Sequence, residues 1–169
     1  MFFAKLEDEG ITLLPAHRLV KKVPEGIDGM LSKYFEIETI ADDFDIRRRL
    51  SGRKNAFGFF KKREKVWHLL SYRGRNLSGL HPDLRDIDVI ILHEMIFKKI
   101  LTNAEIGYEM DIAKALDQVN EGEYAAAFFL NPTQVEDVEK SALSSMRMPP
   151  KSTYFYPKLL TGLVLNKWE

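Results

Sequence analysis

A short segment near the end of the sequence concentrates residues that can bind an anion. Residues 148–158 read Met-Pro-Pro-Lys-Ser-Thr-Tyr-Phe-Tyr-Pro-Lys. Lys151 and Lys158 carry positive charge, and Ser152 and Thr153 add hydroxyl donors, so the segment can offer charge-assisted hydrogen bonds to phosphate oxygens. The structural alternative is a turn in which the prolines stop a helix and the hydroxyls bond the backbone.

Aromatic residues accompany these donors. Tyr154 and Tyr156 alternate with Thr153 and Phe155 in a run that favours a strand. Alternate residues of a strand point to the same face, so the two tyrosines share one face. Tyr156 is therefore a candidate wall of an anion site.

Two other motifs offer further donors. His17 and Arg18 stand side by side at a predicted strand end, and both side chains can donate hydrogen bonds to phosphate. Asn131 follows an apolar run at 124–130 and is predicted to cap a helix that has Pro132 at its first position. The N-terminus of a helix attracts anions through its free N–H groups and its dipole.

Together these motifs predict a phosphate-binding site at the carboxyl ends of strands, where open α/β sheets bind ligands. The predicted members are His17, Arg18, Asn131, Thr133, Lys151, Ser152, Thr153, Tyr156 and Lys158. The predicted partner is a phosphate-containing small molecule. A second interpretation is a structural or protein-interaction domain that has no ligand of its own and forms a homodimer through its first strand.

The sequence excludes several familiar catalytic and metal sites. The absence of cysteine removes thiolate zinc sites, iron–sulfur clusters and cysteine nucleophiles. His93-Glu94 begins like a zinc-protease helix, but Phe97 stands where the second histidine is needed. Gly74 and Gly79 have the spacing of a P-loop without its Lys and Ser/Thr. We therefore predict no metal and no cofactor. Because no general base or nucleophile is identifiable, we predict no catalysis by this chain alone.

Charge is distributed unevenly along a chain whose formal net charge is zero. Residues 47–75 contain eleven basic residues and one acid, whereas residues 104–145 contain nine acids and two bases. Aromatic residues are interleaved with these cations: Phe57, Phe59, Phe60 and Trp67. A nucleic-acid-binding surface would need a positive field and exposed aromatic faces. The interpretation that we favour is a hairpin with a solvated, lysine-rich tip and core-facing aromatics, so nucleic acid is not the expected partner.

The hydrophobic pattern predicts an α/β domain. Strands are predicted at 2–6, 11–14, 35–40, 56–60, 66–72, 106–110, 124–130, 153–156 and 162–168, and helices at 24–34, 43–50, 86–101, 112–121 and 132–145. Asp42 or Asp43 and Asp111 are predicted caps, and Gln134 completes a capping box with Asn131. The β-hairpins and the βαβαβ crossovers of the last third are expected to share one mixed sheet. The predicted unit is one domain over residues 1–169.

The bulk composition is that of an ordinary globular protein. A length of 169 residues suits one domain, and 45% hydrophobic with 30% charged residues is typical of soluble proteins. No apolar run approaches the ~18 residues that a membrane span requires. The lack of cysteine fits a cytoplasmic protein. Because the chain begins inside a predicted strand, we expect it to be part of a longer architecture.

Four motifs in this order resemble a known family. Residues 14–20, 92–94, 131–133 and 148–159 are similar to the bacterial and archaeal family called domain of unknown function 1015. The last motif is the most specific, and the resemblance runs over nearly the whole chain. It implies that this chain corresponds to the C-terminal part of longer members, whose upstream half is remotely ParB-like. Ala16 stands where the family commonly has threonine, which removes one hydroxyl from the predicted site.

Overall fold

The computed structural model describes residues 10–158, which form one α/β domain as predicted. The strands are β1 (Thr12–Leu14), β2 (His17–Val20), β3 (Phe35–Ile40), β4 (Ala56–Lys61), β5 (Val66–Tyr72), β6 (Ile106–Glu109), β7 (Ala126–Phe129) and β8 (Tyr154–Tyr156). The helices are α1 (Ile27–Leu31), α2 (Asp43–Leu50), the 3-10 helix η1 (Pro82–Leu84), α3 (Asp88–Leu92), the π-helix η2 (His93–Phe97), α4 (Ile112–Asn120) and α5 (Val135–Leu143).

Six strands form the main sheet in the order β3-β5-β4-β7-β2-β6, and every neighbouring pair is antiparallel. The predicted β4–β5 hairpin forms, with Ala56 opposite Ser71 and Lys61 opposite Val66. β6 and β7 lie on either side of β2 and both run antiparallel to it. They are therefore parallel to each other, and α4 connects them as the first of the predicted crossovers.

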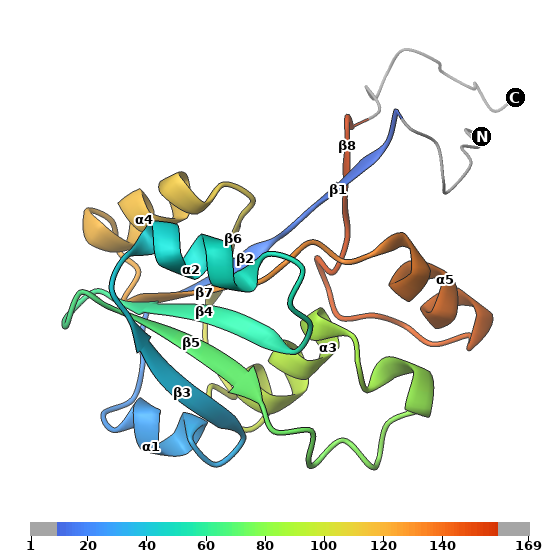
Figure 1. The fold of residues 1–169 in the computed structure, drawn as a ribbon, viewed down its shortest axis with the longest axis horizontal. Coiled ribbons are helices and arrows are strands. Elements are labelled where there is room, and N and C mark those ends of the chain that lie inside the picture. Colours follow the sequence, from blue (N-terminus) through green and yellow to red (C-terminus); the bar gives the residue numbers. More distant parts are fainter. Residues whose placement is uncertain (1–9, 159–169) are drawn as a thin grey trace, which may run out of the picture.

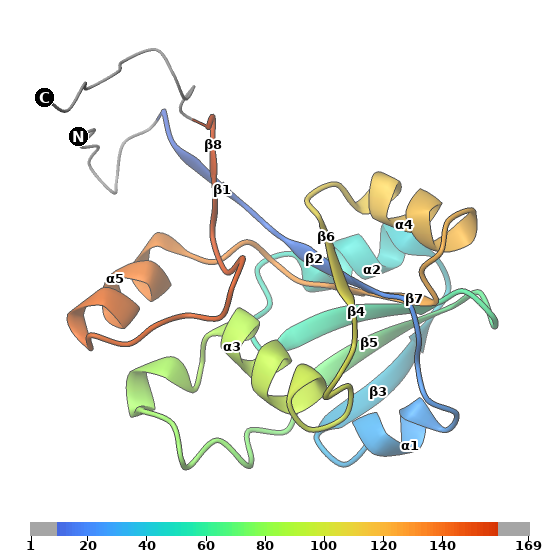
Figure 2. The same cartoon turned by 180° about the vertical axis from the view of Figure 1, so that it is seen from behind.

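Helices cover both faces of the main sheet (Figures 1 and 2). One apolar cluster joins α1, α3 and η2 to the sheet and includes Leu31 and Phe128. The other joins α2 and α4 to the opposite face and includes Ile46 and Phe129. The consecutive residues Phe128 and Phe129 thus serve opposite faces, as the alternation of a strand requires. The apolar run at 124–130 is confirmed as an inner strand covered on both sides.

β1 and β8 form a separate two-stranded arm, with Thr12 opposite Tyr156. Figures 1 and 2 show the arm projecting from the body of the domain. The prediction that both crossovers return to one sheet is wrong for the second crossover. Because β7 already pairs with β2 and β4, a strand after α5 finds no free edge beside β7. The strands predicted at 2–6 and 162–168, and with them the predicted dimer contact, lie outside the described residues.

Local signals place most helix starts correctly. Asp42 and Asp111 cap α2 and α4 as predicted, because their carboxylates accept hydrogen bonds from the backbone N–H groups of Asp45 (2.8 Å) and Lys114 (3.0 Å). The buried helix predicted at 86–101 forms as α3 followed by η2. Within residues 10–158, no helix is long and apolar enough to cross a membrane.

Two helix starts differ from the prediction. α1 begins after Gly26, whose φ of 70° is left-handed, so the helix cannot extend back to Pro24. Asn131 does not cap α5; the N-cap residue is Gln134, whose backbone N–H donates to Asp137 Oδ2 at 3.4 Å. The physical reason is that the Asn131 amide is bonded to the connection between α2 and β4. Its Nδ2 donates to the carbonyls of Leu50 (2.7 Å) and Arg53 (3.0 Å).

Candidate functional site

Arg18 lies in the interior on β2, with 4% of its surface exposed. Its guanidinium donates hydrogen bonds to the backbone carbonyls of Ala16, Pro150 (3.5 Å) and Lys151 (3.1 Å). The ring of Tyr108 lies 4.6 Å from its Cζ, and no carboxylate in the described part of the chain pairs with it. Burial lowers the pKa of Arg18 to about 10, so the side chain stays charged at neutral pH.

Residues 149–152, the strap, are fastened to the body partly by this guanidinium and partly by hydroxyl groups. Thr133 Oγ1 donates to the carbonyl of Ser152 at 2.7 Å, and Ser152 Oγ donates to the carbonyl of Pro149 at 2.5 Å. Lys151 has a φ of 58°, in the left-handed region that non-glycine residues seldom adopt. Three buried donors that the sequence places in a phosphate site, Arg18, Thr133 and Ser152, are therefore bonded to backbone carbonyls of the strap.

His17 is packed in the core beside β7, with 1% of its surface exposed. Its Nδ1 accepts a hydrogen bond from Leu130 N–H at 3.5 Å, and its ring lies 5.0 Å from that of Phe129. Burial, followed by repulsion from Arg18, lowers the pKa of His17 to about 4. The imidazole is therefore neutral at pH 7 and adds no positive charge near the strap.

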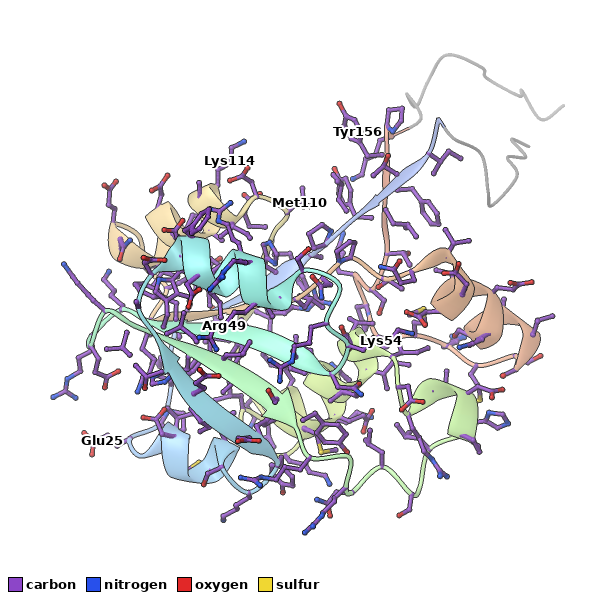
Figure 3. The ribbon with its side chains drawn as sticks, viewed as in Figure 1. Glu25, Arg49, Lys54, Met110, Lys114 and Tyr156 are labelled. Atoms are coloured by element: carbon purple, nitrogen blue, oxygen red, sulfur yellow. The ribbon has the colours of Figure 1, made fainter. Side chains whose placement is uncertain are left out.

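The remaining predicted residues lie in several places. Lys151 and Thr153 belong to the strap or follow it directly, and the Lys151 side chain is exposed. Tyr156, 56% exposed, lies on the arm away from the body, as Figure 3 shows. Lys158 places its Nζ 4.6 Å from the centre of a β8 tyrosine ring. The structure thus joins the strap to Arg18 and Thr133, whereas Asn131 faces another connection and Tyr156 lies on the arm.

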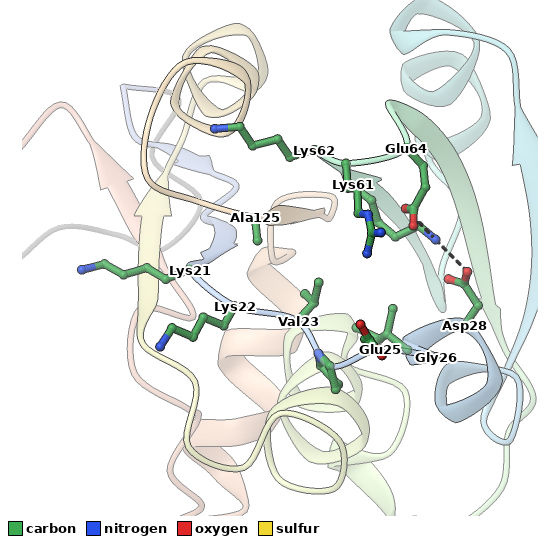
Figure 4. A pocket seen from close by; sticks show the side chains of 13 residues that line it. Lys21, Lys22, Val23, Glu25, Gly26, Asp28, Lys61, Lys62, Glu64 and Ala125 are labelled. Carbon is green, nitrogen blue, oxygen red and sulfur yellow. Dashed lines mark hydrogen bonds and ion pairs between the residues drawn. The ribbon is translucent and has the colours of Figure 1, made fainter.

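A basic cavity of about 820 Å³ lies at the other end of β2 (Figure 4). Lysines reach it from the connection that follows β2 and from the turn between β4 and β5, and α1 contributes an aspartate. Its charged lining residues are Lys21, Lys22, Glu25, Asp28, Lys61, Lys62, Arg63 and Glu64. The apolar lining residues are Val23, Pro24, Ile27 and Ala125.

Two of the five lining cations are paired with carboxylates. Lys61 Nζ lies 2.6 Å from Asp28 Oδ2 and 3.0 Å from Glu64 Oε2, and Figure 4 shows the first of these contacts as a dashed line. Burial lowers the pKa of Lys61, but hydrogen bonds to the two carboxylates outweigh burial and the net pKa is raised. Lys21 pairs with two carboxylates outside the lining, at 2.9 and 3.3 Å.

The other three lining cations have no carboxylate partner. Lys62 Nζ donates to the carbonyl of Gly122 at 2.8 Å. Lys22 and Arg63 make no hydrogen bond or ion pair with any residue that the structure describes, and the same is true of Glu25. The cavity therefore combines uncompensated positive charge with an apolar floor, which suits an organic anion.

Comparison with solved structures identifies proteins of similar fold. A conserved hypothetical protein from Pyrococcus furiosus matches with 16% identity and a TM-score of 0.56, over 91% of this chain and 60% of that chain. A free serine kinase in complex with AMP matches with 17% identity and a TM-score of 0.56, over 91% and 57%. A mutant free serine kinase in complex with ADP matches with 16% identity and a TM-score of 0.55, over 91% and 57%.

At these identities the likeness shows a shared fold. The chain spans about three fifths of the length of these proteins, at 57% to 60% of each. No protein-family model and no curated protein matches the chain. Among residues 10–158, no group of three or more histidine, cysteine or carboxylate side chains is arranged to hold a metal ion.

Sequence reasoning found one side of the basic cavity and missed the other. The charged hairpin tip at 61–65 was identified and interpreted as solvated, but Lys61 is buried in ion pairs. Lys21 and Lys22 carry only a weak signal, because a pair of lysines after a strand does not reveal which turn it will face. The sequence signal for the cavity is limited to two groups of basic residues, one at a strand end and one at a later hairpin tip.

The basic region does not present a stacking surface. The aromatic residues that a single-stranded nucleic acid would need are in the core: Phe57, Phe59, Phe60 and Trp67. Phe59 stacks on Phe128 at 4.5 Å between ring centroids, and Trp67 contacts Phe129 at 5.0 Å. The favoured interpretation of core-facing aromatics is thus confirmed by their burial.

Proposed function

We propose that this domain binds a phosphate-containing small molecule, with nucleotides as the leading candidates, in the basic cavity. The observation that carries the proposal is the cavity itself. Its 820 Å³ lies within the range of small-molecule sites, and Lys22, Lys62 and Arg63 line it without a carboxylate partner. Arginine can hold two phosphate oxygens at once, and lysine supplies a mobile point charge.

The fold comparisons support the choice of ligand. Free serine kinase structures of similar fold hold AMP or ADP. Nucleotides are therefore the first compounds to test on this chain. In the proposed complex, phosphate oxygens accept hydrogen bonds from Lys22 and Arg63, while Val23 and Ile27 contact the organic part of the ligand. The proposal concerns binding.

Calorimetric titration of AMP and ADP into the protein at low ionic strength tests this proposal. We expect saturable binding that Lys22→Glu and Arg63→Glu each weaken by about tenfold or more. A charge-assisted hydrogen bond contributes about 1.5–3 kcal/mol, which corresponds to that factor. Lys33→Glu is the matched control, because Lys33 is exposed and lies outside the cavity lining. Absence of saturable binding by both nucleotides would overturn the proposal.

The strap is a second candidate location for the same ligand. The observation that favours it is the buried, charged Arg18, which fixes the Lys151 backbone while the Lys151 side chain extends into solvent. Preorganised backbone with an unusual φ is common at binding sites. Lys151→Glu distinguishes the two locations. If it abolishes binding while Arg63→Glu has no effect, the ligand binds at the strap.

We also propose that the resemblance to the domain of unknown function 1015 family reflects common descent. The contacts between its motifs support this, because Arg18 bonds to Lys151 and Thr133 bonds to Ser152 across long sequence separations. In that case these family motifs describe how the strap is fastened, and the basic cavity is a separate feature of the chain.

A further inference from the structure

We infer that the basic cavity selects a ligand with one phosphate group, attached to an apolar or ring-shaped body, over a di- or triphosphate. This inference rests on the proposed function and adds the charge and the class of the ligand. It follows from the number of charges that face the cavity and from which of them are already paired.

The unpaired charges give the first count. Lys22, Lys62 and Arg63 have no carboxylate partner, and Glu25 is the unpaired acid among the lining residues, so three cations and one carboxylate leave two net positive charges. Within the lining itself, five cations stand against three carboxylates, and the two carboxylates that pair with Lys21 lie outside it. A dianion therefore balances the unpaired charges of the lining.

A phosphate monoester is such a dianion. Its second pKa is about 6, so it carries nearly two negative charges at neutral pH. Each further phosphate adds negative charge that no unpaired cation of the lining is left to balance. That charge would also approach Glu25, Asp28 and Glu64, and like charges at close range oppose binding.

The surroundings of Lys21 strengthen this limit. Glu105 and Glu123 both pair with Lys21, at 2.9 and 3.3 Å, so this lysine has little attraction left for an anion. Lys22 contributes at longer range to the lowered pKa of Glu105, after the hydrogen bond and charge of Lys21. The positive field behind the cavity is thus already reduced, and a third ligand charge would gain little from it.

The apolar floor defines the rest of the ligand. Val23, Pro24, Ile27 and Ala125 line the cavity together with the stems of the lysines. An inorganic phosphate would leave this surface and most of the 820 Å³ in contact with water. Burial of an organic body against the floor removes apolar surface from water and so favours binding. We therefore expect a monoester to bind more tightly than inorganic phosphate.

The test is a set of titrations without divalent cations, at one ionic strength, with AMP, ADP, ATP, inorganic phosphate and a single-stranded oligonucleotide as probes. We expect AMP to bind at least about fivefold more tightly than ADP or inorganic phosphate, and ATP to bind most weakly. Glu25→Lys raises the net charge of the lining by two and should reverse the order, so that ADP and ATP bind more tightly than AMP. Glu36→Lys makes the same charge change at an exposed position of β3 and should leave the order unchanged.

The outcomes separate this inference from the function on which it rests. If ADP or ATP binds the unmodified protein as tightly as AMP, and Arg63→Glu still weakens binding, the proposed function stands and the selectivity is refuted. If a single-stranded oligonucleotide binds more tightly than every mononucleotide, the cavity belongs to a polyanion surface and the inference is refuted. If no probe binds, both proposals fall.

Discussion

Arg18 shows how a residue with the chemistry of an anion ligand can serve a structural purpose. Its guanidinium reaches carbonyls on both sides of the junction between β2 and the strap: Ala16 on one side, Pro150 and Lys151 on the other. The planar fork of arginine makes several directed bonds from one buried group, which a lysine ammonium cannot reproduce at the same positions. The residue type was read correctly as a multiple donor, but its acceptors are carbonyl oxygens of the chain.

We therefore expect Arg18→Lys to lower the free energy of unfolding by about 1–3 kcal/mol, because at least one buried carbonyl loses its donor. Denaturation in urea measures this. Arg75→Lys is the control, since Arg75 is exposed, and it should change stability by less than about 0.5 kcal/mol. Equal stability of the two variants would mean that the guanidinium bonds do not hold the strap.

At the scale of elements, the start of α5 offers a direct comparison between two capping residues. Asp137→Ala removes the carboxylate that accepts from Gln134 N–H, so we expect faster hydrogen exchange in the first turn of α5 and a loss of about 0.5–2 kcal/mol. Asn131→Ala removes the bonds to Leu50 and Arg53 and should instead speed exchange around residues 51–55. Faster hydrogen exchange in the first turn of α5 after Asn131→Ala would contradict this prediction, because it would show that Asn131 caps the helix.

Elements with local signals were predictable, and those that depend on distant partners were not. The β4–β5 hairpin and the caps at Asp42 and Asp111 are encoded within a few residues of each other. The pairing of β1 with β8 joins residues from the two ends of the described chain, and periodicity says nothing about which strands will meet. The capping motif at Asn131 was misread because a distant connection takes up its side chain.

The whole molecule creates the basic cavity through its strand order. β7 lies between β2 and β4 and pairs antiparallel with both of them. β2 and β4 are therefore parallel to each other, and the segments that follow them leave the sheet at the same end. This brings Lys22 and Arg63 to one cavity, although neither residue is part of a recognisable motif. Sequence reasoning located the strap because its residues are contiguous, and it could not locate a site whose two halves meet only in the folded sheet.

Acid sensitivity is also a property of the whole molecule, because two buried groups on different elements titrate with opposite effects. Burial raises the pKa of Asp88 to about 6, against the hydrogen bond from Asn55 N–H to its Oδ1 at 2.7 Å. Burial lowers the pKa of His17 to about 4. Shifts of this size each correspond to roughly 3 kcal/mol between the protonation states.

The signs follow from which state binds more protons. Between about pH 4 and 6, Asp88 is protonated in a larger fraction of folded molecules than of unfolded ones. The contribution of Asp88 to the free energy of unfolding therefore falls as the pH rises. Between about pH 4 and 6.5, His17 is protonated in a larger fraction of unfolded molecules than of folded ones. The contribution of His17 to the free energy of unfolding therefore rises with pH. The two effects oppose each other over nearly the same window, and together they leave only a weak pH dependence.

Asp88→Asn should uncover the effect of His17. Asparagine keeps an oxygen acceptor for Asn55 N–H but cannot ionise, so we expect a gain in stability at pH 7 and a loss of about 1–3 kcal/mol on acidification to pH 4.5. His17→Gln should give the opposite slope, because the contribution of Asp88 then remains alone. Urea denaturation at a series of pH values measures both slopes, with the exposed Asp117→Asn as control. Parallel pH profiles for all of these variants would show that the two buried groups do not set the response of the fold to acid.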